Sequence, residues 1–328
     1  MKEEVLFDPK LPSLLKYDAK VLRGKNGRLF LDHDSNHVIK QFTGELMFTE
    51  RQLFDWQHLL ENRIAWLGKL GIPYFFLVPP NAHPVYPEDL PDSVRAADLR
   101  PVHQLIQHLE QQGSFAELIY PLDDLLEAKP NPLLYAKTDT HWTAHGAYIG
   151  YQRLMDAVSS AVPVHRVTED AIRYHESLWM GELGFKVDPK EESVTTTAIV
   201  DTPPGYLLSD NRVFNRGMLV VTECPDAPPT TCVGFVDSFA RAMHTFLAST
   251  FRRFVFAYAP TLDYDLVLRE RPDVVVSVMN ERFLMTIPYD VGAPTVEEFE
   301  REKKAEGLLR DEVAYWPKLD EHSEVTGA

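Results

Sequence analysis

Apolar residues in this chain switch between helical spacing and short continuous runs. Residues 48–70 carry apolar side chains three and four positions apart, which predicts an amphipathic helix that Gly71 ends. Residues 72–78 follow as an apolar run that stops at a Pro-Pro-Asn turn and predicts a buried strand. This succession of helix and strand predicts a sheet with crossover helices.

The same pattern fills most of the chain. Residues 273–279 form the continuous apolar type of strand that is found in parallel sheets. Other strands are predicted at 28–31, 116–120 and 254–258, and other helices at 93–113, 122–128, 144–158, 239–251 and 264–269. Residues 163–230 have few periodic runs and many prolines, so we expect a β-rich or loop-rich insertion there. Residues 295–315 predict a charged, solvated helix.

Length and charge narrow the choice of partners. The chain has 328 residues, enough for one large α/β domain or two small ones. Hydrophobic residues make up 45% and charged residues 25%, as in ordinary soluble globular proteins. The formal net charge of -16 argues against nucleic acid and anionic membranes as main partners, because both require a basic face.

The cysteines indicate no metal or redox site, and the apolar runs indicate no export signal or membrane span. Cys224 and Cys232 are the only cysteines and form no CxxC pair, which argues against a zinc knuckle or a redox dithiol. One disulfide and two free thiols both fit. The first 20 residues lack an apolar core of signal-peptide length, and no run is long enough to span a bilayer. We expect a cytoplasmic protein without stable membrane insertion, or a periplasmic one if the chain has been trimmed.

Two short segments contain the parts of a catalytic triad. Asp139 and His141 are two positions apart, so in an extended segment their side chains point to the same side. The carboxylate can then hold one imidazole nitrogen while the other faces a substrate. Ser238 ends an apolar run and precedes a helical pattern, the position of a nucleophile at the carboxyl end of a strand. Together they predict a Ser-His-Asp triad.

Structural roles compete with this interpretation. Asp139 can cap a helix beside a hydrogen-bonded core histidine, and Ser238 can simply begin a helix. Asp237 directly precedes Ser238 and is expected to cap the following helix. His141 and His145 are four residues apart, which suits a metal pair. A zincin needs Glu directly after the first His, and Trp142 stands there, so no metal site is expected.

The chain resembles the AlgJ/AlgX-like alginate O-acetyltransferases, a branch of the SGNH hydrolase superfamily, from about residue 20 to about residue 285. Four segments carry the likeness: Gly-Arg-Leu-Phe-Leu at 27–31 with Asp-Ser-Asn at 34–36 and Gln-Phe-Thr-Gly at 41–44, Val-Pro-Pro-Asn at 78–81 with Val-Tyr-Pro at 85–87, Thr-Asp-Thr-His-Trp-Thr at 138–143 with Gly-Ala at 146–147, and Asp-Ser-Phe at 237–239 with Arg241. The resemblance implies a three-layer α/β/α sandwich of SGNH-hydrolase type, with a mostly parallel sheet, as a single domain over 1–328.

The resemblance also implies roles for the triad residues. Ser238 would be the nucleophile, His141 the general base and acid, and Asp139 the residue that orients His141. The His segment precedes the Ser segment, which is the reverse of ordinary SGNH esterases and a mark of this branch. Asn280, at the end of the next strand, is the candidate side chain for the oxyanion hole. Val236 stands where the family usually has Gly, and a β-branched residue resists the positive φ that Gly permits.

Three further residues are candidates for substrate binding. Asn36 and Asn81 lie in loops that the family places near the site, and Arg241 belongs to the serine segment. Turn or surface roles compete with substrate binding at the two asparagines. Trp142 is expected to pack and fix the loop of His141.

The function expected from these features is acyl transfer through an acyl-serine. An acyl donor such as acetyl-CoA or an acylated carrier would acylate Ser238, and a hydroxyl of a sugar-like acceptor would take the acyl group. No dissociable cofactor is required. An esterase, in which water replaces the sugar, is the alternative within enzymes. A non-catalytic binding protein on the same fold is the alternative outside them, and Val236 is the feature that favours it.

Overall fold

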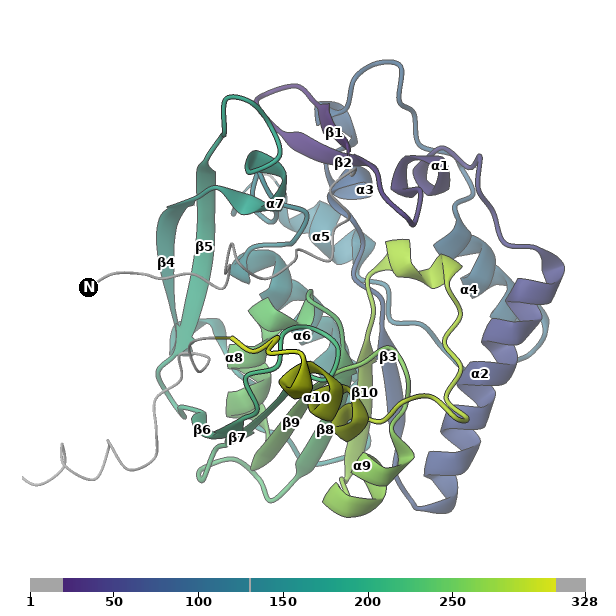
Figure 1. The fold of residues 1–328 in the computed structure, drawn as a ribbon, viewed down its shortest axis with the longest axis vertical. Helices are drawn as coiled ribbons and strands as arrows, with labels where there is room; N and C mark the ends of the chain where they lie inside the picture. The colour runs from purple at the N-terminus through teal and green to yellow at the C-terminus, as the bar shows by residue number, and fades with distance from the viewer. Residues whose placement is uncertain (1–19, 130, 311–328) are drawn as a thin grey trace, which may run out of the picture.

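The computed structural model describes residues 20–129 and 131–310 and centres on a six-stranded sheet (Figure 1). The strand order is β3 (Tyr74–Leu77), β10 (Val274–Val278), β8 (Thr231–Val236), β9 (Arg253–Tyr258), β7 (Leu219–Glu223) and β6 (Tyr206–Asp210). The first four strands are parallel. β7 runs antiparallel to β9, and β6 runs antiparallel to β7. The sheet is therefore mixed and mostly parallel, as expected.

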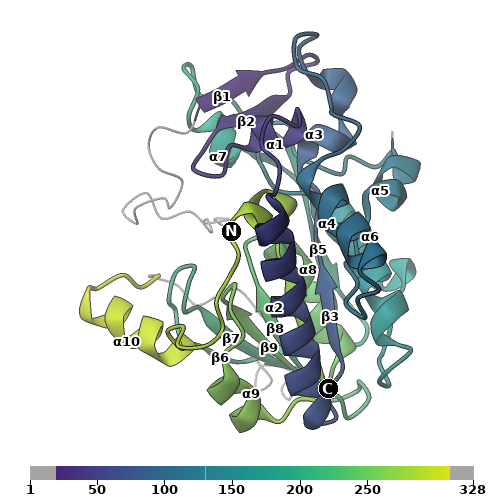
Figure 2. The same cartoon turned by 90° about the vertical axis from the view of Figure 1, so that its right-hand side faces the viewer.

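Helices cover both faces of this sheet and produce the expected three-layer α/β fold. Cys232 and Val236 of β8 pack in one cluster with α6 (Ala144–Val158) and α8 (Ala240–Thr250). Val233 and Phe235, which alternate with them, pack on the opposite face with α9 (Tyr264–Glu270). That face also carries α2 (Glu50–Lys69) and α4 (Pro101–Gln111), and Figure 2 shows α2 running alongside β3. Because both faces are covered, all five residues of β10 are buried, which explains its continuous apolar run.

The remaining elements surround the sheet. The β1 (Lys20–Arg23) and β2 (Leu29–His33) hairpin lies at the top of Figures 1 and 2 with α1 (Val38–Phe42), α3 (Ala82–Val85) and α7 (Gly181–Gly184). The β4 (Ile172–Trp179) and β5 (Ser193–Val200) hairpin stands at the left of Figure 1. The short helix α5 (Leu122–Ala128) and the helix α10 (Val296–Ala305) complete the described strands and α-helices, and short 3-10 helices lie at Pro87–Asp89, Glu169–Ala171 and Glu281–Met285.

Local sequence signals mark where some of the helices begin. Thr49 and Gln52 form a reciprocal capping box that starts α2, and Thr295 with Glu298 does the same for α10. The helix expected over 93–113 begins only at Pro101, which occupies its first position. The run 116–120 pairs with the sheet through a single bridge from Leu77 to Ile119 instead of forming a strand.

Residues 163–230 are β-rich, which is one of the two forms expected for this region. They hold the β4–β5 hairpin and also β6 and β7, which extend the central sheet at the edge beyond β9. Both strands are only five residues long and have weak periodicity, so their sequence did not reveal this pairing. The predicted charged helix ends at Ala305, and residues 311–315 of that prediction lie outside the described part of the chain.

Both cysteines are buried free thiols. Of the two alternatives left open by the sequence, one disulfide or two free thiols, the structure has the second. Burial raises the pKa of both Cys224 and Cys232. Among residues 20–129 and 131–310, no helix is long and apolar enough to cross a membrane.

Candidate active site

Asp139, His141 and Ser238 form one continuous chain of hydrogen bonds. The Oδ1 atom of Asp139 lies 2.8 Å from Nδ1 of His141, and Nε2 of His141 lies 2.8 Å from Oγ of Ser238. Asp139 and His141 stand on the loop between α5 and α6, whereas Ser238 follows β8 at its carboxyl end. Ser238 and His141 are half-buried and Asp139 is buried. The serine end of this hydrogen-bonded triad is therefore its solvent-accessible end.

Trp142 joins the two segments that carry these residues. Its indole nitrogen donates a 2.8 Å hydrogen bond to the carbonyl of Phe239, the residue after Ser238. Its ring packs on the ring of Phe239 and against Gly150 of α6, where an added Cβ would lie 2.6 Å from the indole. The His141 ring lies 5.0 Å from the Phe239 ring. Trp142 therefore packs between the loop of His141 and the loop of Ser238. This position is consistent with the packing role that the sequence predicted for it.

Four hydrogen bonds hold the Asp139 carboxylate. Oδ1 accepts from the backbone amide of His141 as well as from its ring, and Oδ2 accepts from the indole of Trp179 at 3.0 Å and the amide of Glu182 at 3.1 Å. Burial by itself raises the pKa of Asp139, but the hydrogen bonds and the nearby imidazole outweigh it and lower this pKa to about 2. The carboxylate therefore stays charged and fixes one tautomer of His141.

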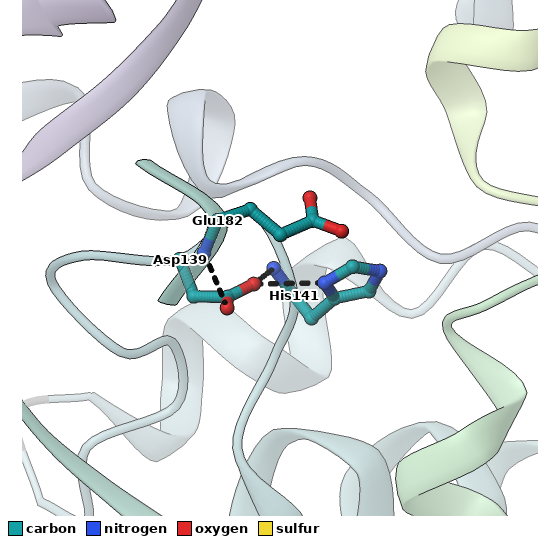
Figure 3. Close-up of side chains that lie close together, drawn as sticks. All are labelled: Asp139, His141 and Glu182. Carbon is teal, nitrogen blue, oxygen red and sulfur yellow. Dashed lines mark hydrogen bonds and ion pairs between the residues drawn. The ribbon is translucent and has the colours of Figure 1, made fainter. Parts of the chain in front are cut away.

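Glu182 places a second carboxylate beside the imidazole, as Figure 3 shows. Its Oε2 accepts a 3.0 Å hydrogen bond from Thr140, between Asp139 and His141. Burial lowers the pKa of His141, but the charge of Glu182 and the hydrogen bond to Asp139 prevail, so this pKa lies above its ordinary value. Both carboxylates thus stabilise the imidazolium that forms when His141 takes a proton.

The loop that presents Glu182 depends on a glycine. Gly181 has a φ of +63°, and a Cβ there would lie 2.2 Å from the carbonyl oxygen of Thr138. This close approach lets the amides of Leu183 and Gly184 donate to that same carbonyl at 3.0 Å. Glycine is required here both for the left-handed backbone and for the contact.

Ligand atoms of Asp139, His141 and Glu182 lie within 4.8 Å of one another, which is close enough to share a metal ion. A metal on the ring nitrogen that faces Asp139 would break the hydrogen bond that orients the imidazole. His145, whose spacing from His141 would suit a metal pair, stacks on Tyr174, with the ring centroids 3.9 Å apart. The arrangement therefore suits proton transfer better than metal binding.

Asp237 has its own structural role. Its Oδ1 accepts from the amide of Phe239 at 2.9 Å, and its Oδ2 accepts from the amide of Asn280 at 2.7 Å. Its carboxylate thus ties the turn after β8 to the end of β10. Burial raises the pKa of Asp237 above its ordinary value.

Val236 occupies an ordinary strand position. It pairs in register with Tyr258 of β9 and Val278 of β10, and it is 1% exposed in the core against α6 and α8. Positive φ among the described residues occurs elsewhere. The valine therefore causes no backbone strain, and the physical objection that it raised against catalysis does not apply.

Asn280 is fully buried and its amide group is engaged by protein. Its Nδ2 donates to the carbonyls of Pro79 at 2.9 Å and Pro80 at 3.2 Å, and its Oδ1 accepts from the amide of Arg282. This geometry ties the end of β10 to the Pro-Pro turn after β3. It leaves no amide hydrogen of Asn280 for an oxyanion, in contrast to the role expected from the resemblance.

The three expected substrate-binding residues have mainly protein partners. Asn36 bonds to Asp34, and Asn81 bonds to Glu281 through both its backbone and its side-chain nitrogen. Arg241 donates to Asn215 at 2.5 Å, and its guanidinium lies over the rings of Phe214 and Tyr258. Of the three, Asn81 lines a small cavity together with Asp139 and Thr140.

Four residues of the site escaped sequence reasoning. Trp179 and Glu182 come from the segment whose pattern was too weak to interpret. Tyr258 ends β9 beside the nucleophile strand, and a hydrogen bond to Ser238 acts against the burial that raises the pKa of its hydroxyl. Arg282, two residues beyond Asn280, lines the same cavity as Asp139. Tyr258, as a polar residue at the end of a strand, and Arg282, shortly after the end of β10, are the two that left a signal in the sequence.

The family model described as SGNH hydrolase-like domain, acetyltransferase AlgX, matches residues 21–186, half of the chain, and the chain belongs to that family. The match includes Asp139 and His141 and ends before Ser238. Membership of this family places the protein in the general class of O-acetyltransferase enzymes. No curated protein matches the sequence significantly.

Solved structures support the same fold. The chain is similar to Bacillus cereus PatB1, with a TM-score of 0.61 at 14% identity over 81% of this chain and 97% of that one. It is also similar to the O-acetyltransferase domain of Pseudomonas putida AlgJ, with a TM-score of 0.58 at 17% identity over 87% and 99%. A DHHW family protein from Eubacterium siraeum gives a TM-score of 0.55 at 17% identity over 86% and 98%. At such identities the likeness concerns the fold alone.

Proposed function

We propose that the protein transfers an acyl group, most simply acetyl, through an acyl-serine at Ser238 to a hydroxyl of a sugar-like acceptor. One observation carries the proposal: the hydrogen-bonded chain from Asp139 through His141 to Ser238, with 2.8 Å at both links. Family membership supplies the acetyltransferase class, and the acceptor follows from the resemblance to enzymes that modify polysaccharides.

The first half-reaction would acylate the enzyme. His141 Nε2 takes the hydroxyl proton as Ser238 Oγ bonds to the acyl carbon, and the carbonyl electron pair moves onto its oxygen. When that pair returns, the bond to the leaving group breaks, and His141 gives its proton to the departing atom. Asp139 and Glu182 stabilise the imidazolium between the two steps. An acylated carrier or acetyl-CoA would be the donor.

The second half-reaction would regenerate the serine. An acceptor hydroxyl attacks the acyl-enzyme while His141 takes its proton, and Ser238 recovers a proton from His141 as it leaves. Water in place of the sugar would make the same site an esterase. The acceptor therefore decides the reaction class, and the chemistry at Ser238 is common to both.

Intact mass after incubation with p-nitrophenyl acetate tests the acyl-serine. We expect one added acetyl group in the wild type, together with a burst of nitrophenol, and neither in Ser238→Ala. Ser160→Ala, which removes an exposed serine at the end of α6, controls for acetylation of surface hydroxyls. Equal acetylation of the wild type and Ser238→Ala would contradict the proposal and favour a binding protein.

Adding oligosaccharides to the acetylated enzyme tests the acceptor. Transfer is expected to appear as an acetylated sugar and as faster loss of the enzyme-bound acetyl group. Release of acetate alone, at a rate independent of neutral or acidic oligosaccharides, would make the protein an esterase.

A further inference from the structure

Arg282 is a buried arginine whose backbone is fixed on both sides. It is 3% exposed and lies in the single-turn 3-10 helix Glu281–Met285 that follows β10. Its amide donates to Oδ1 of Asn280, and its carbonyl accepts a 2.9 Å hydrogen bond from Gln41. The direction in which the side chain leaves the backbone is therefore set by the protein.

The guanidinium group of Arg282 has no anionic partner in the protein. Within residues 20–129 and 131–310 it makes no hydrogen bond and no ion pair, and its Nε is shielded from solvent. Other buried arginines do have acidic partners: Arg28 with Asp89, Arg63 with Asp290, and Arg100 with Glu281. The rings of Phe239 and Phe283 lie 5.6 and 4.8 Å from the Arg282 Cζ and supply only cation–π contacts. Since a buried cation without an anion is unfavourable, the site is suited to an anion from outside.

Arg282 also lies close to the residues of the triad. Its Cζ and the centroid of the His141 ring lie 5.6 and 5.0 Å from the centroid of the Phe239 ring, so both groups contact the same side chain. Arg282 lines one cavity together with Asp139 and Thr140. Its positive charge acts at this site, because it opposes the rise of the pKa of both His141 and Asp237.

Most other donors near the nucleophile are engaged by the protein itself. The amides of Phe239 and Asn280 donate to Asp237, and the side-chain nitrogen of Asn280 donates to two proline carbonyls. The amide of Ser238 has no acceptor among the described residues. Besides the Tyr258 hydroxyl, which is already hydrogen-bonded to Ser238, the Ser238 N–H and the Arg282 guanidinium therefore remain to stabilise negative charge.

We infer that Arg282 is a catalytic residue that binds the acyl oxygen when it becomes negatively charged. This inference rests on the proposed acyl-serine mechanism. As the Ser238 Oγ bonds to the acyl carbon, the carbonyl pair moves onto the oxygen, and Arg282 and the Ser238 amide hold that oxyanion. The pair then reforms the carbonyl as the leaving group departs. Fixed donors of this kind contribute most where charge develops, because they need no reorganisation.

Binding of n-butaneboronic acid tests the inference without turnover. Its boron accepts a lone pair from Ser238 Oγ while His141 takes the proton, which leaves a tetrahedral anion with an oxygen in the oxyanion position. We expect Arg282→Met to weaken this affinity about 100-fold, the size of effect seen when one oxyanion donor is removed. Arg282→Lys, which keeps the charge and loses the planar fork, should weaken it less.

Arg253→Gln is the matched control, because Arg253 begins β9 at the opposite end of the sheet and pairs with Glu270. It should bind the boronate as the wild type does. The melting temperature of Arg282→Met should equal or exceed that of the wild type, because the substitution breaks no ion pair. Affinity within threefold of the wild type, or unfolding of both Arg282 variants, would overturn the assignment. Wild-type boronate binding that survives Ser238→Ala would instead contradict the acyl-serine itself.

Discussion

The indole nitrogen of Trp179 lies 3.0 Å from Oδ2 of Asp139 and donates a hydrogen bond to it. Trp179 is the last residue of β4, so the hairpin inserted between the histidine and serine segments helps to hold the carboxylate. The same insertion supplies Glu182 through α7. A region whose sequence showed little periodicity therefore supports the orienting carboxylate of the site.

Trp179→Phe removes this donor while keeping an aromatic ring. A hydrogen bond to a charged group contributes about 1.5–3 kcal/mol, and part of it remains because the Glu182 amide still binds Oδ2. We expect kcat for acyl transfer to fall about tenfold with KM unchanged. Leu178→Ala, at the exposed neighbouring position, should leave kcat unaltered. A wild-type kcat in Trp179→Phe would show that the indole hydrogen bond does not orient Asp139.

Glu182→Gln removes a negative charge that raises the pKa of His141. His141 must be neutral to accept the proton of Ser238, so activity declines as the pH falls through its pKa. Lowering that pKa moves the acidic limb of the kcat/KM profile to lower pH. Glu176→Gln, on the exposed face of β4, should leave the limb in place. A shift of the limb to higher pH in Glu182→Gln would contradict the electrostatic role of Glu182.

The depressed pKa of Asp139 links stability to pH. This pKa is about 2 in the folded protein against an ordinary 3.8, so the folded state binds fewer protons. The resulting stability is present above about pH 4 and is lost as the pH falls toward 2, by on the order of 2 kcal/mol. Urea unfolding between pH 4.5 and 2.5 should show a steeper loss of stability in the wild type than in Asp139→Asn. Parallel curves would mean that Asp139 has no such link.

Gly181→Ala should displace the loop that carries Glu182. The substitution adds a Cβ 2.2 Å from the Thr138 carbonyl at a φ of +63°. Gly71 has a similar φ of +75° with open space around it, so Gly71→Ala measures the backbone cost alone, about 1–2 kcal/mol. We expect Gly181→Ala to be the more destabilising in thermal unfolding and to reduce acylation of Ser238. Equal effects of the two substitutions would show that the loop accommodates the methyl group.

Val236→Gly restores the residue usual in the family, and we expect it to be harmful. Val236 is buried in an ordinary strand, so glycine would leave a cavity and add backbone freedom, at a combined cost of about 3 kcal/mol. Val233→Gly, on the other face of β8, should cost a similar amount. A Val236→Gly variant that acylates faster per folded molecule would revive the objection that valine distorts the turn.

The sequence alone determined the elements whose side-chain pattern is strong. The boundaries of α5 and α6 agree with the predicted 122–128 and 144–158, because amphipathic periodicity is a local property. The pairing of Asp139 with His141 was also predicted, but from an extended segment, whereas residues 140 and 141 form a bend in which Oδ1 of Asp139 also accepts from the His141 amide. The position of Ser238 at a strand end followed from the apolar run before it.

Tertiary structure decided everything that depends on contacts between distant segments. The engagement of Asn280 by Pro79 and Pro80, about 200 residues away, could not be inferred from its strand-end position. Trp179 and Glu182 reach the site only because α7 binds the Thr138 carbonyl through a close glycine contact. The isolation of Arg282 likewise appears only when its surroundings are assembled. Local pattern fixes which face of an element is buried, whereas partners across the fold depend on how the elements pack.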